Sequence, residues 1–321
     1  ALRASTSSKA ERAGSHINEE HQGSSQTKNI KGHPMQLDSI RGNSQRLDGG
    51  AMFGNCPRAV WTRWSPPDDE NRIDLACRAL LVREASGRTI LFETGVGAFF
   101  APDMRERYGI FEAEHVLLRS LEAVGVAASD VDVVVLSHLH FDHSGGALAP
   151  YVDGRPLELA FENAHYVIGE KGYARATAPH PRDRASFIPE FPALLEATGR
   201  VERVSGTTSS TLGPGYSFTY TDGHTPGLML SRIECADPGP INFVSDLIPG
   251  VPWIHAPITM GYDRYPELLI DEKIETLERV VANNEWLFLT HDPGTAICRV
   301  TRDERGRYKA ADERAELHVS N

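Results

Sequence analysis

The sequence contains little cysteine, no long apolar run and less positive than negative charge. Its four cysteines are Cys56, Cys77, Cys235 and Cys298. Because they form no C-x-x-C pair and are widely spaced, we expect neither a disulfide scaffold nor a cysteine zinc site. Buried free thiols in a reducing compartment are expected instead, which favours a cytoplasmic location. No apolar run approaches the roughly 18 residues of a membrane span, so no transmembrane helix is expected.

The deficit of positive charge argues against two classes of partner. The chain has 33 basic and 44 acidic residues among its 321, and a formal net charge of −11. The first 50 residues hold seven basic and five acidic residues, so the rest of the chain carries −13. Nucleic acids and anionic membranes both attract clustered basic residues. We therefore expect neither nucleic acid nor a membrane surface as a partner.

The N-terminal segment differs in composition from the rest of the chain. Residues 1–50 are mostly Ser, Gly, Gln, Asn and Lys, and they contain no apolar segment typical of a signal peptide. The chain begins at Ala1, whereas Met35 opens a stretch that reads like a native start. We expect residues 1–34 to be a disordered leader or an added extension, and residues 35–321 to form a single domain.

Hydrophobic periodicity predicts a mixture of strands and helices. Apolar, β-branched runs bounded by turn residues predict strands at 75–82, 89–92, 131–136, 164–168, 217–221, 229–233, 241–244 and 286–289. Helical spacing predicts helices at 112–124 and 266–282. The Pro-rich stretch 170–200 predicts an inserted cap with a short helix at 193–197, and 301–321 an exposed terminal strand or tail. Hairpin-like strands followed by alternating strands and helices indicate a layered α/β sandwich.

The most informative segment is residues 138–143, His-Leu-His-Phe-Asp-His, which directly follows the strand predicted at 131–136. Imidazole is a preferred zinc ligand, and a carboxylate adds a harder, charged oxygen. Adjacent residues on a strand face opposite ways, so this density of ligands requires a turn. Gly145 and Gly146 supply a permissive backbone for the turn, which lets Asp142 and His143 face a second ion.

Three further ligand-type residues stand at or just past the ends of other predicted strands. They are His224, Asp246 and His291. Binding residues are often carried on loops that a rigid scaffold positions, so we expect these side chains to complete the metal site. Asp222, two residues before His224, either orients a ligand histidine or is an ordinary turn residue.

The order of these ligand blocks resembles the metallo-β-lactamase superfamily. The blocks are HLHFDH at 138–143, GHTPG at 223–227, the aspartate at 246 after an apolar strand, and THDP at 290–293. The resemblance covers residues 72–295, the expected core of the domain. It implies a four-layer αβ/βα sandwich in which helices flank two central mixed β-sheets.

The resemblance also implies a dinuclear zinc centre in the cleft between the sheets, with Mn, Co or Fe as alternative metals. One zinc would have three histidine ligands, which are His138, His140 and His224. The other would have the ligands Asp142, His143 and His291. Asp246 resembles the bridging carboxylate of the family. Glu93 and Thr94 resemble the acidic-Thr-Gly strand end that supports the site from behind.

The chemistry implied by such a centre is hydrolysis of an ester bond. Two zinc ions about 3.5–4 Å apart hold a bridging hydroxide that attacks a carbonyl or phosphoryl centre. Asp142 is expected to hold the hydroxide and then, as general acid, to give a proton to the leaving group. No serine or cysteine nucleophile is required.

Blocks outside the ligand set resemble the quorum-quenching branch of the acyl-homoserine lactonases. These blocks are residues 52–54, 57–61, 71–73, 253–255 and 260–263. One position departs from that branch: Pro249 stands three residues after Asp246, where several lactonases place a tyrosine that orients the substrate carbonyl. We expect Tyr262 or Tyr265 to take the place of that tyrosine.

The sequence therefore predicts a dinuclear zinc enzyme that opens the lactone ring of N-acyl-homoserine lactones, which are small-molecule substrates. An alternative is hydrolysis of organophosphates or aryl esters on the same centre, because the related methyl-parathion hydrolases share the ligand set. A third interpretation is a metal-binding protein that has the fold and no catalytic activity.

Several apolar residues are candidates for an acyl pocket. They are Phe53, Trp61, Phe99, Phe100, Trp253, Met260 and Tyr262. A mostly apolar cleft with a few polar groups suits a small hydrophobic ester. The alternative for each residue is ordinary core packing, or packing against a second subunit in a homodimer.

Overall fold

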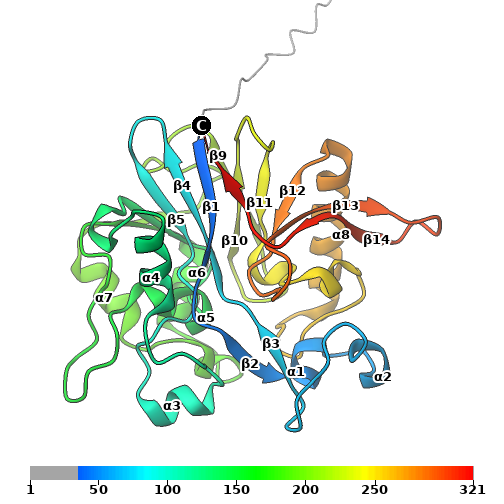
Figure 1. The fold of residues 1–321 in the computed structure, drawn as a ribbon, viewed down its shortest axis with the longest axis horizontal. Helices are drawn as coiled ribbons and strands as arrows, with labels where there is room; N and C mark the ends of the chain where they lie inside the picture. Colours follow the sequence, from blue (N-terminus) through cyan, green and yellow to red (C-terminus); the bar gives the residue numbers. More distant parts are fainter. Residues whose placement is uncertain (1–34, 321) are drawn as a thin grey trace, which may run out of the picture. The chain divides into compact units, whose positions relative to one another are not determined.

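The computed structural model describes residues 35–320 as two β-sheets with helices on their outer sides (Figure 1). The predicted leader at 1–34 lies outside the described residues. Both sheets are mixed, and apolar side chains from the two sheets meet in one buried cluster between them. The predicted sandwich of two mixed sheets flanked by helices is thus confirmed.

The first sheet runs in the order β15-β1-β4-β5-β6-β7-β8. Its strands are β1 (Met35–Arg41), β4 (Arg78–Glu84), β5 (Thr89–Phe92), β6 (Val133–Leu136), β7 (His165–Gly169), β8 (Val201–Val204) and β15 (His318–Val319). Neighbours from β15 to β5 pair antiparallel, whereas β5 to β8 pair parallel. β6 is buried along its whole length, as expected for a central parallel strand covered on both faces.

The second sheet runs in the order β14-β13-β12-β11-β10-β9. Its strands are β9 (Tyr216–Thr221), β10 (Leu228–Ile233), β11 (Ile241–Phe243), β12 (Trp286–Phe288), β13 (Ile297–Arg302) and β14 (Tyr308–Arg314). Only β11 and β12 pair parallel, and α8 lies in the chain between them. β2 (Gln45–Asp48) and β3 (Arg72–Leu75) pair antiparallel in a separate, two-stranded sheet.

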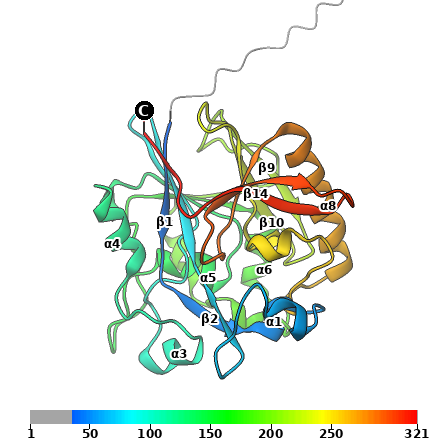
Figure 2. The same ribbon diagram turned by 45° about the vertical axis from the view of Figure 1, so that its right-hand side comes forward.

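Eight α-helices occur among residues 35–320. They are α1 (Gly49–Phe53), α2 (Arg58–Trp61), α3 (Pro102–Arg107), α4 (Val116–Ala123), α5 (Phe141–Ser144), α6 (Glu170–Thr177), α7 (Phe191–Ala197) and α8 (Pro266–Asn283). Figure 2 shows α8 on the outer side of the second sheet, away from α4. None of the described helices has the length and apolar character needed to cross a bilayer.

The structure corrects the prediction for residues 170–200 and confirms an exposed terminal strand within residues 301–321. Residues 170–200 are not an inserted cap: α6 and α7 pack on the first sheet, and Phe191 and Leu195 belong to its outer core. α6 contains few large apolar residues, and its buried residues are Gly172, Tyr173 and Ala176, so its sequence gave little signal of a helix packed on a sheet. Residues 301–321 add strands to both sheets, since β14 ends the second sheet and β15 returns to β1 of the first.

The four cysteines are free thiols, and three of them are buried.

Candidate metal centre

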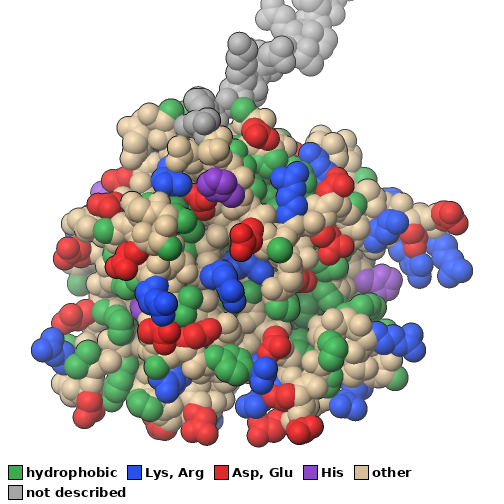
Figure 3. All heavy atoms as spheres, viewed as in Figure 1, with side chains coloured by type: hydrophobic (Ala, Val, Ile, Leu, Met, Phe, Trp, Pro, Cys, Tyr) green, Lys and Arg blue, Asp and Glu red, His purple; other side chains and the backbone are tan. Residues whose placement is uncertain are grey.

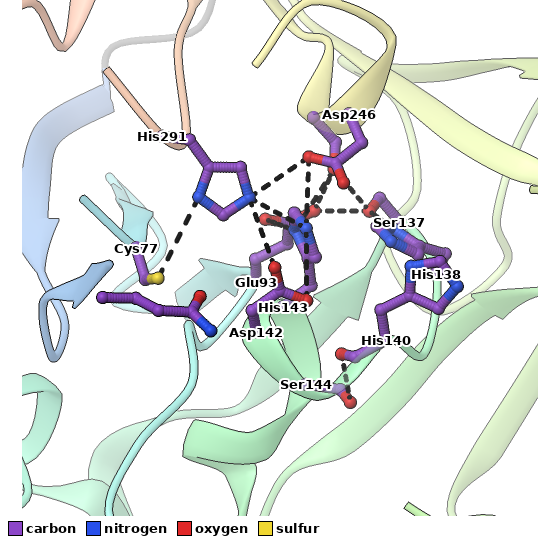
Figure 4. Close-up of polar contacts among 12 residues, drawn as sticks. Cys77, Glu93, Ser137, His138, His140, Asp142, His143, Ser144, Asp246 and His291 are labelled. Carbon is purple, nitrogen blue, oxygen red and sulfur yellow. Dashed lines mark hydrogen bonds and ion pairs between the residues drawn. The ribbon is translucent and has the colours of Figure 1, made fainter. Parts of the chain in front are cut away.

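The predicted ligands all lie on segments that follow strands of the two sheets. Residues 138–143 follow β6, and α5 begins directly after His140. His224 lies in the turn between β9 and β10, Asp246 in the short turn after β11, and His291 shortly after β12. Figure 4 shows the side chains of Asp246 and His291 pointing toward that of His143. The fold therefore gathers side chains that are more than 150 residues apart in the sequence.

The ligand-type residues form three overlapping groups among the described residues, and two of these groups together contain all of the predicted ligands. The first group is His138, His140, His224 and Asp246, and the second is Asp142, His143 and His291. Within each group, one ligand atom from every residue lies within 4.8 Å of the others.

Asp246 lies between the two groups. Its Oδ2 is 3.1 Å from Nε2 of His224, in the first group. Its Oδ1 is 3.2 Å from Nε2 of both His143 and His291, in the second group. This is the position that a bridging carboxylate would need.

Unsatisfied polar atoms inside the site indicate that the residues fit cations. Nε2 of His138, Nε2 of His140 and Oδ1 of Asp246 are buried and make no hydrogen bond within the described chain. Nε2 of His291 also lies only 3.1 Å from Nε2 of His143. Buried polar atoms normally have partners, and clustered imidazoles with carboxylates are the ligands that zinc and similar divalent ions prefer. Two adjacent divalent cations would satisfy both groups.

The electrostatics of the site separate its histidines into two kinds. Burial, reinforced by neighbouring histidines, holds the pKa of His138 and of His140 well below the usual range. Burial also acts to lower the pKa of His143 and of His291, but the Asp246 carboxylate and its neighbours outweigh it and raise both pKa values well above that range. Neighbouring histidines thus dominate the surroundings of the first pair, and carboxylates those of the second pair.

Glu93 supports the second group from behind, as the sequence predicted. Its side chain is fully buried, and Oε2 accepts a hydrogen bond of 2.8 Å from Nδ1 of His143. Oε1 accepts from the hydroxyls of Ser137 and Ser245. Thr94 adds a hydrogen bond of 3.0 Å from Oγ1 to the backbone carbonyl of His143. These contacts fix the ring of His143 with Nε2 facing the centre.

Sequence reasoning missed Ser245. It has a φ of 44° and Glu93 a φ of 59°, and both values lie in the left-handed region that residues with side chains rarely adopt. Strain of this kind persists where surrounding contacts impose it, often at functional sites. Neither positive φ angle could have been predicted from the sequence.

Asp263, not Asp222, orients His224. Oδ1 of Asp263 accepts a hydrogen bond of 2.9 Å from Nδ1 of His224, and both side chains are buried. Asp222 accepts instead from the backbone N–H of Gly227 at 2.8 Å and pairs with Lys171. The turn-residue alternative for Asp222 is therefore confirmed. Asp263 ends a block that resembles the lactonases, which was the only signal for it in the sequence.

Most of the predicted pocket residues are packed in the core. Phe53, Trp61, Trp253 and Met260 belong to one buried apolar cluster and are at most 3% exposed. The ring of Phe53 stacks between those of Trp61 and Trp253, at centroid distances of 5.3 and 4.6 Å. Core packing within one subunit is thus the interpretation that the structure favours for these four residues. Stacked aromatic rings shield one another from solvent, which the sequence pattern does not reveal.

Tyr262 differs from the other predicted pocket residues because it is 41% exposed. Burial of its hydroxyl and the nearby Asp142 and Asp48 carboxylates raise its pKa. Its hydroxyl therefore remains protonated at neutral pH, in the electrostatic field of the centre.

An apolar cleft of about 530 Å³ lies next to the first ligand group. Phe99, Phe100, Tyr108, Phe141 and Phe187 are among its lining residues. The ring of Phe187 packs on that of His140 at 4.7 Å, and Phe141 lies between His140 and Asp142 in the chain. Two of the predicted pocket residues, Phe99 and Phe100, thus line a cleft beside the site. A larger cleft of about 1000 Å³ is lined by His291, Trp253 and the exposed Trp64, among others.

Comparison with protein families agrees with this geometry. The family model of the metallo-beta-lactamase superfamily matches residues 72–291, more than half of the chain. The chain belongs to this superfamily. The predicted family and the metallo-beta-lactamase fold are therefore confirmed.

Individual relatives of this metallo-beta-lactamase chain include a known lactonase. An N-acyl homoserine lactonase from Bacillus sp. is 28% identical over 133 residues, which are 41% of this chain and 45% of that protein. The matched region thus spans less than half the length of that relative.

Solved structures share the fold at lower identity. A probable metal-dependent hydrolase from Staphylococcus aureus has a TM-score of 0.76 at 21% identity, covering 88% of this chain and 99% of that one. AidC, a dizinc quorum-quenching lactonase in complex with its product, has a TM-score of 0.70 at 20% identity and covers 89% and 96%. The hydrolase AbOPH has a TM-score of 0.65 at 18% identity and covers 92% and 100%.

Proposed function

We propose that the protein is a dinuclear zinc hydrolase that opens the lactone ring of N-acyl-homoserine lactones. The observation that carries this proposal is the pair of ligand groups that meet at Asp246. His138, His140 and His224 would hold one ion, and Asp142, His143 and His291 the other. The lactonase relative and the fold shared with a dizinc quorum-quenching lactonase support the substrate class.

When bound, the two ions supply Lewis acidity toward the lactone carbonyl and a nucleophilic hydroxide at neutral pH. The chain supplies the proton transfer. The Asp142 carboxylate lies 3.7 Å from Nε2 of His291 and 3.9 Å from Nε2 of His143, and its side chain is 15% exposed. It would accept the proton of the hydroxyl group that has added to the carbonyl and deliver it to the ring oxygen, which leaves as an alcohol while the acyl group becomes a carboxylate.

Two further features of the chain suit an acyl-homoserine lactone. The apolar cleft lined by Phe99, Phe100 and Phe141 excludes water and takes the acyl chain. The protonated hydroxyl of Tyr262 donates a hydrogen bond to a substrate carbonyl, in place of the tyrosine that Pro249 replaces. Ring opening then needs no nucleophile from the protein itself.

The first test is proton release by the zinc-loaded protein on a long-chain acyl-homoserine lactone at neutral pH. His140→Ala removes one proposed ligand, and His165→Ala, at an exposed position on β7, is the matched control. We expect metal-dependent ring opening that His140→Ala abolishes and His165→Ala retains.

A phosphotriester and an aryl ester are assayed beside the lactone. Cleavage of these substrates without lactone opening would overturn the lactonase proposal and establish the organophosphate alternative. Stoichiometric zinc with no turnover of any ester would establish a metal-binding protein without catalytic activity.

A further inference from the structure

Arg78 is a buried cation that the proposed chemistry does not use. It is the first residue of β4, in the first sheet, and it is 5% exposed. Among residues 35–320, its guanidinium donates hydrogen bonds only to backbone carbonyls. These acceptors are the carbonyls of Leu289, Asp292, Pro293 and Thr295. A guanidinium offers several N–H donors in a fixed fork, so it can bind several acceptors of one loop at once.

The carbonyls that Arg78 contacts belong to the loop that carries His291. This loop, residues 289–296, joins β12 to β13 in the second sheet. Arg78 contacts it on both sides of His291: the bond to Leu289 lies before the histidine, and the bonds to Pro293 and Thr295 lie after it, each at 3.3 Å. Backbone carbonyls in a loop have no strand partner, so a buried loop depends on donors of this kind.

Backbone contacts place the segment before β4 directly against His291. The N–H of Ala76 donates to the carbonyl of His291, and the N–H of Arg78 donates to that of Thr290, both at 3.1 Å. Nδ1 of the His291 ring donates in turn to the carbonyl of Ala76 at 2.7 Å. The thiol of Cys77 lies 3.9 Å from the same nitrogen (Figure 4). The contact between the two sheets therefore holds both the backbone and the ring of His291.

The direction of the His291 ring makes this arrangement relevant to the metal. A metal-bound imidazole is neutral, and with its proton on Nδ1 its lone pair is on Nε2. Nε2 of His291 lies 3.1 Å from Nε2 of His143 and 3.2 Å from Oδ1 of Asp246. A backbone carbonyl that accepts from Nδ1 orients such a ring. Any shift of the loop relative to β4 would move Nε2 away from the other ligands.

We propose that Arg78 is a positioning residue for the metal centre. Its guanidinium fixes the loop of residues 289–296 against β4, and this contact keeps Nε2 of His291 facing the second ligand group. The inference rests on the dinuclear centre proposed above. Loss of a contact that orients a metal-bound histidine typically weakens metal binding about 10- to 100-fold. The effect should fall on the ion held by Asp142, His143 and His291.

The first test measures the zinc affinity of the full chain by competition with a chromophoric chelator. Arg78→Met removes every donor of the side chain, whereas Arg78→Lys keeps the charge and a smaller set of donors. Arg83→Met is the matched control, because Arg83 lies on the same strand and donates instead to the Val124 carbonyl and to Asp38. The visible spectrum of the Co²⁺-loaded protein reports the geometry of each metal site.

We expect Arg78→Met to weaken one of two zinc equivalents about 10- to 100-fold and to change the Co²⁺ bands of one site. Arg78→Lys should lose less affinity, because an ammonium group replaces some of the bonds but lacks the fixed fork of a guanidinium. Arg83→Met should bind both equivalents as tightly as the unmodified protein does.

The second test reads the loop contact without any metal. Amide hydrogen exchange of the chelator-treated protein follows the N–H groups at positions 76 and 78, which bond to the loop. Relative to the amides of β6, which report unfolding of the sheet, we expect these two to exchange about tenfold faster in Arg78→Met. The same ratio should be unchanged in Arg83→Met.

Three results would overturn the proposal. If Arg78→Met folds and binds two zinc equivalents as tightly as Arg83→Met, Arg78 does not position a ligand, and the metal centre stands without it. If both equivalents weaken equally and the exchange ratio is unchanged, Arg78 acts only on the stability of the whole fold. If the unmodified protein binds no zinc, the proposed function is wrong, and faster exchange in Arg78→Met would show that Arg78 holds a loop without a metal ligand.

Discussion

Glu93 shows how much one side chain contributes to the arrangement of the centre. Three donors converge on its buried carboxylate: Nδ1 of His143 and the hydroxyls of Ser137 and Ser245. Ser137 also contacts Nδ1 of His138 at 2.9 Å, so the same network reaches a ligand of the first group. Because the carboxylate offers only acceptors, all three donors can be satisfied at once.

Glu93→Gln tests this network. The amide keeps the size of the side chain but offers an N–H₂ group where the structure requires an acceptor, so one donor loses its partner. We expect zinc affinity to fall about 10- to 100-fold, as measured by chelator competition. Glu162→Gln, at an exposed position, is the control. Equal affinities for the two variants would show that Glu93 does not orient His143.

At the scale of secondary-structure elements, the turn between β9 and β10 depends on its contact with α8. A Cβ added to Gly223 would lie 2.4–2.5 Å from the backbone and Cβ atoms of Leu269, closer than real contacts allow. Only glycine lets this turn approach the helix so closely. The position of His224, the next residue, is therefore set by the packing of a turn on a helix.

Gly223→Ala should separate the turn from α8. Relief of the overlap has to move either the turn or the helix, at a cost of about 1–3 kcal/mol in the free energy of unfolding. The urea midpoint measures this loss. Gly206→Ala is the control, because a Cβ at Gly206 would meet open space. A Gly223→Ala midpoint no lower than that of the control would contradict the packing argument.

The loop after β8 supplies a pH-dependent contribution to stability. Burial raises the pKa of Glu202, but hydrogen bonds from Ser209, Ser210 and Thr211 outweigh it and lower the pKa to about 2, from the usual 4.5. A carboxyl group with a depressed pKa stabilises the fold above its unfolded value, and this contribution disappears as the pH falls toward 2. Because Glu202 is partly exposed, we discount the shift to about 1–2 kcal/mol.

Glu202→Gln should therefore lower the free energy of unfolding at pH 7 by about 1–2 kcal/mol. The difference from the unmodified protein should shrink below pH 4.5 and vanish near pH 2. Urea titrations at several pH values measure both quantities. A difference that is constant across this range would show that the charge of Glu202 does not contribute.

At the scale of the whole molecule, the proposed metal ligands come from both sheets. Residues 138–143 extend from the first sheet, whereas His224, Asp246 and His291 extend from the second. Elsewhere the sheets meet mainly through the apolar cluster between them. On the face shown in Figure 3, Lys and Arg side chains are interspersed with Asp and Glu.

Removal of metal should accordingly lower the stability of the whole fold. An ion present at about 1,000 times its Kd stabilises the folded state by about 4 kcal/mol, which corresponds to a Tm shift of about 10 °C in a protein of this size. We expect scanning calorimetry to show a fall of that order when zinc is removed with a chelator. His140→Ala should respond less to the chelator. A Tm unaffected by the chelator would contradict a bound metal that links the sheets.

The comparison of sequence and structure separates local from distant information. The ligands at 138–143 could be predicted from the sequence because they lie within six residues of one another. A strand end followed by a turn is enough to bring their side chains together. Many of the strands could be predicted from apolar runs. β1 and β8 were not predicted, because their mixed polar and apolar residues show no clear hydrophobic period.

The sequence by itself determined the superfamily, the two-sheet fold and the residue types at the centre, because each depends on short motifs and local periodicity. Only the tertiary structure decided which carboxylate supports which histidine. Asp263 and not Asp222 orients His224, although Asp222 is only two residues away and Asp263 is 39 residues away. It also decided that Phe53 and Trp61 pack in the core. These outcomes depend on contacts between distant segments. Local sequence patterns do not predict which distant segments will be in contact.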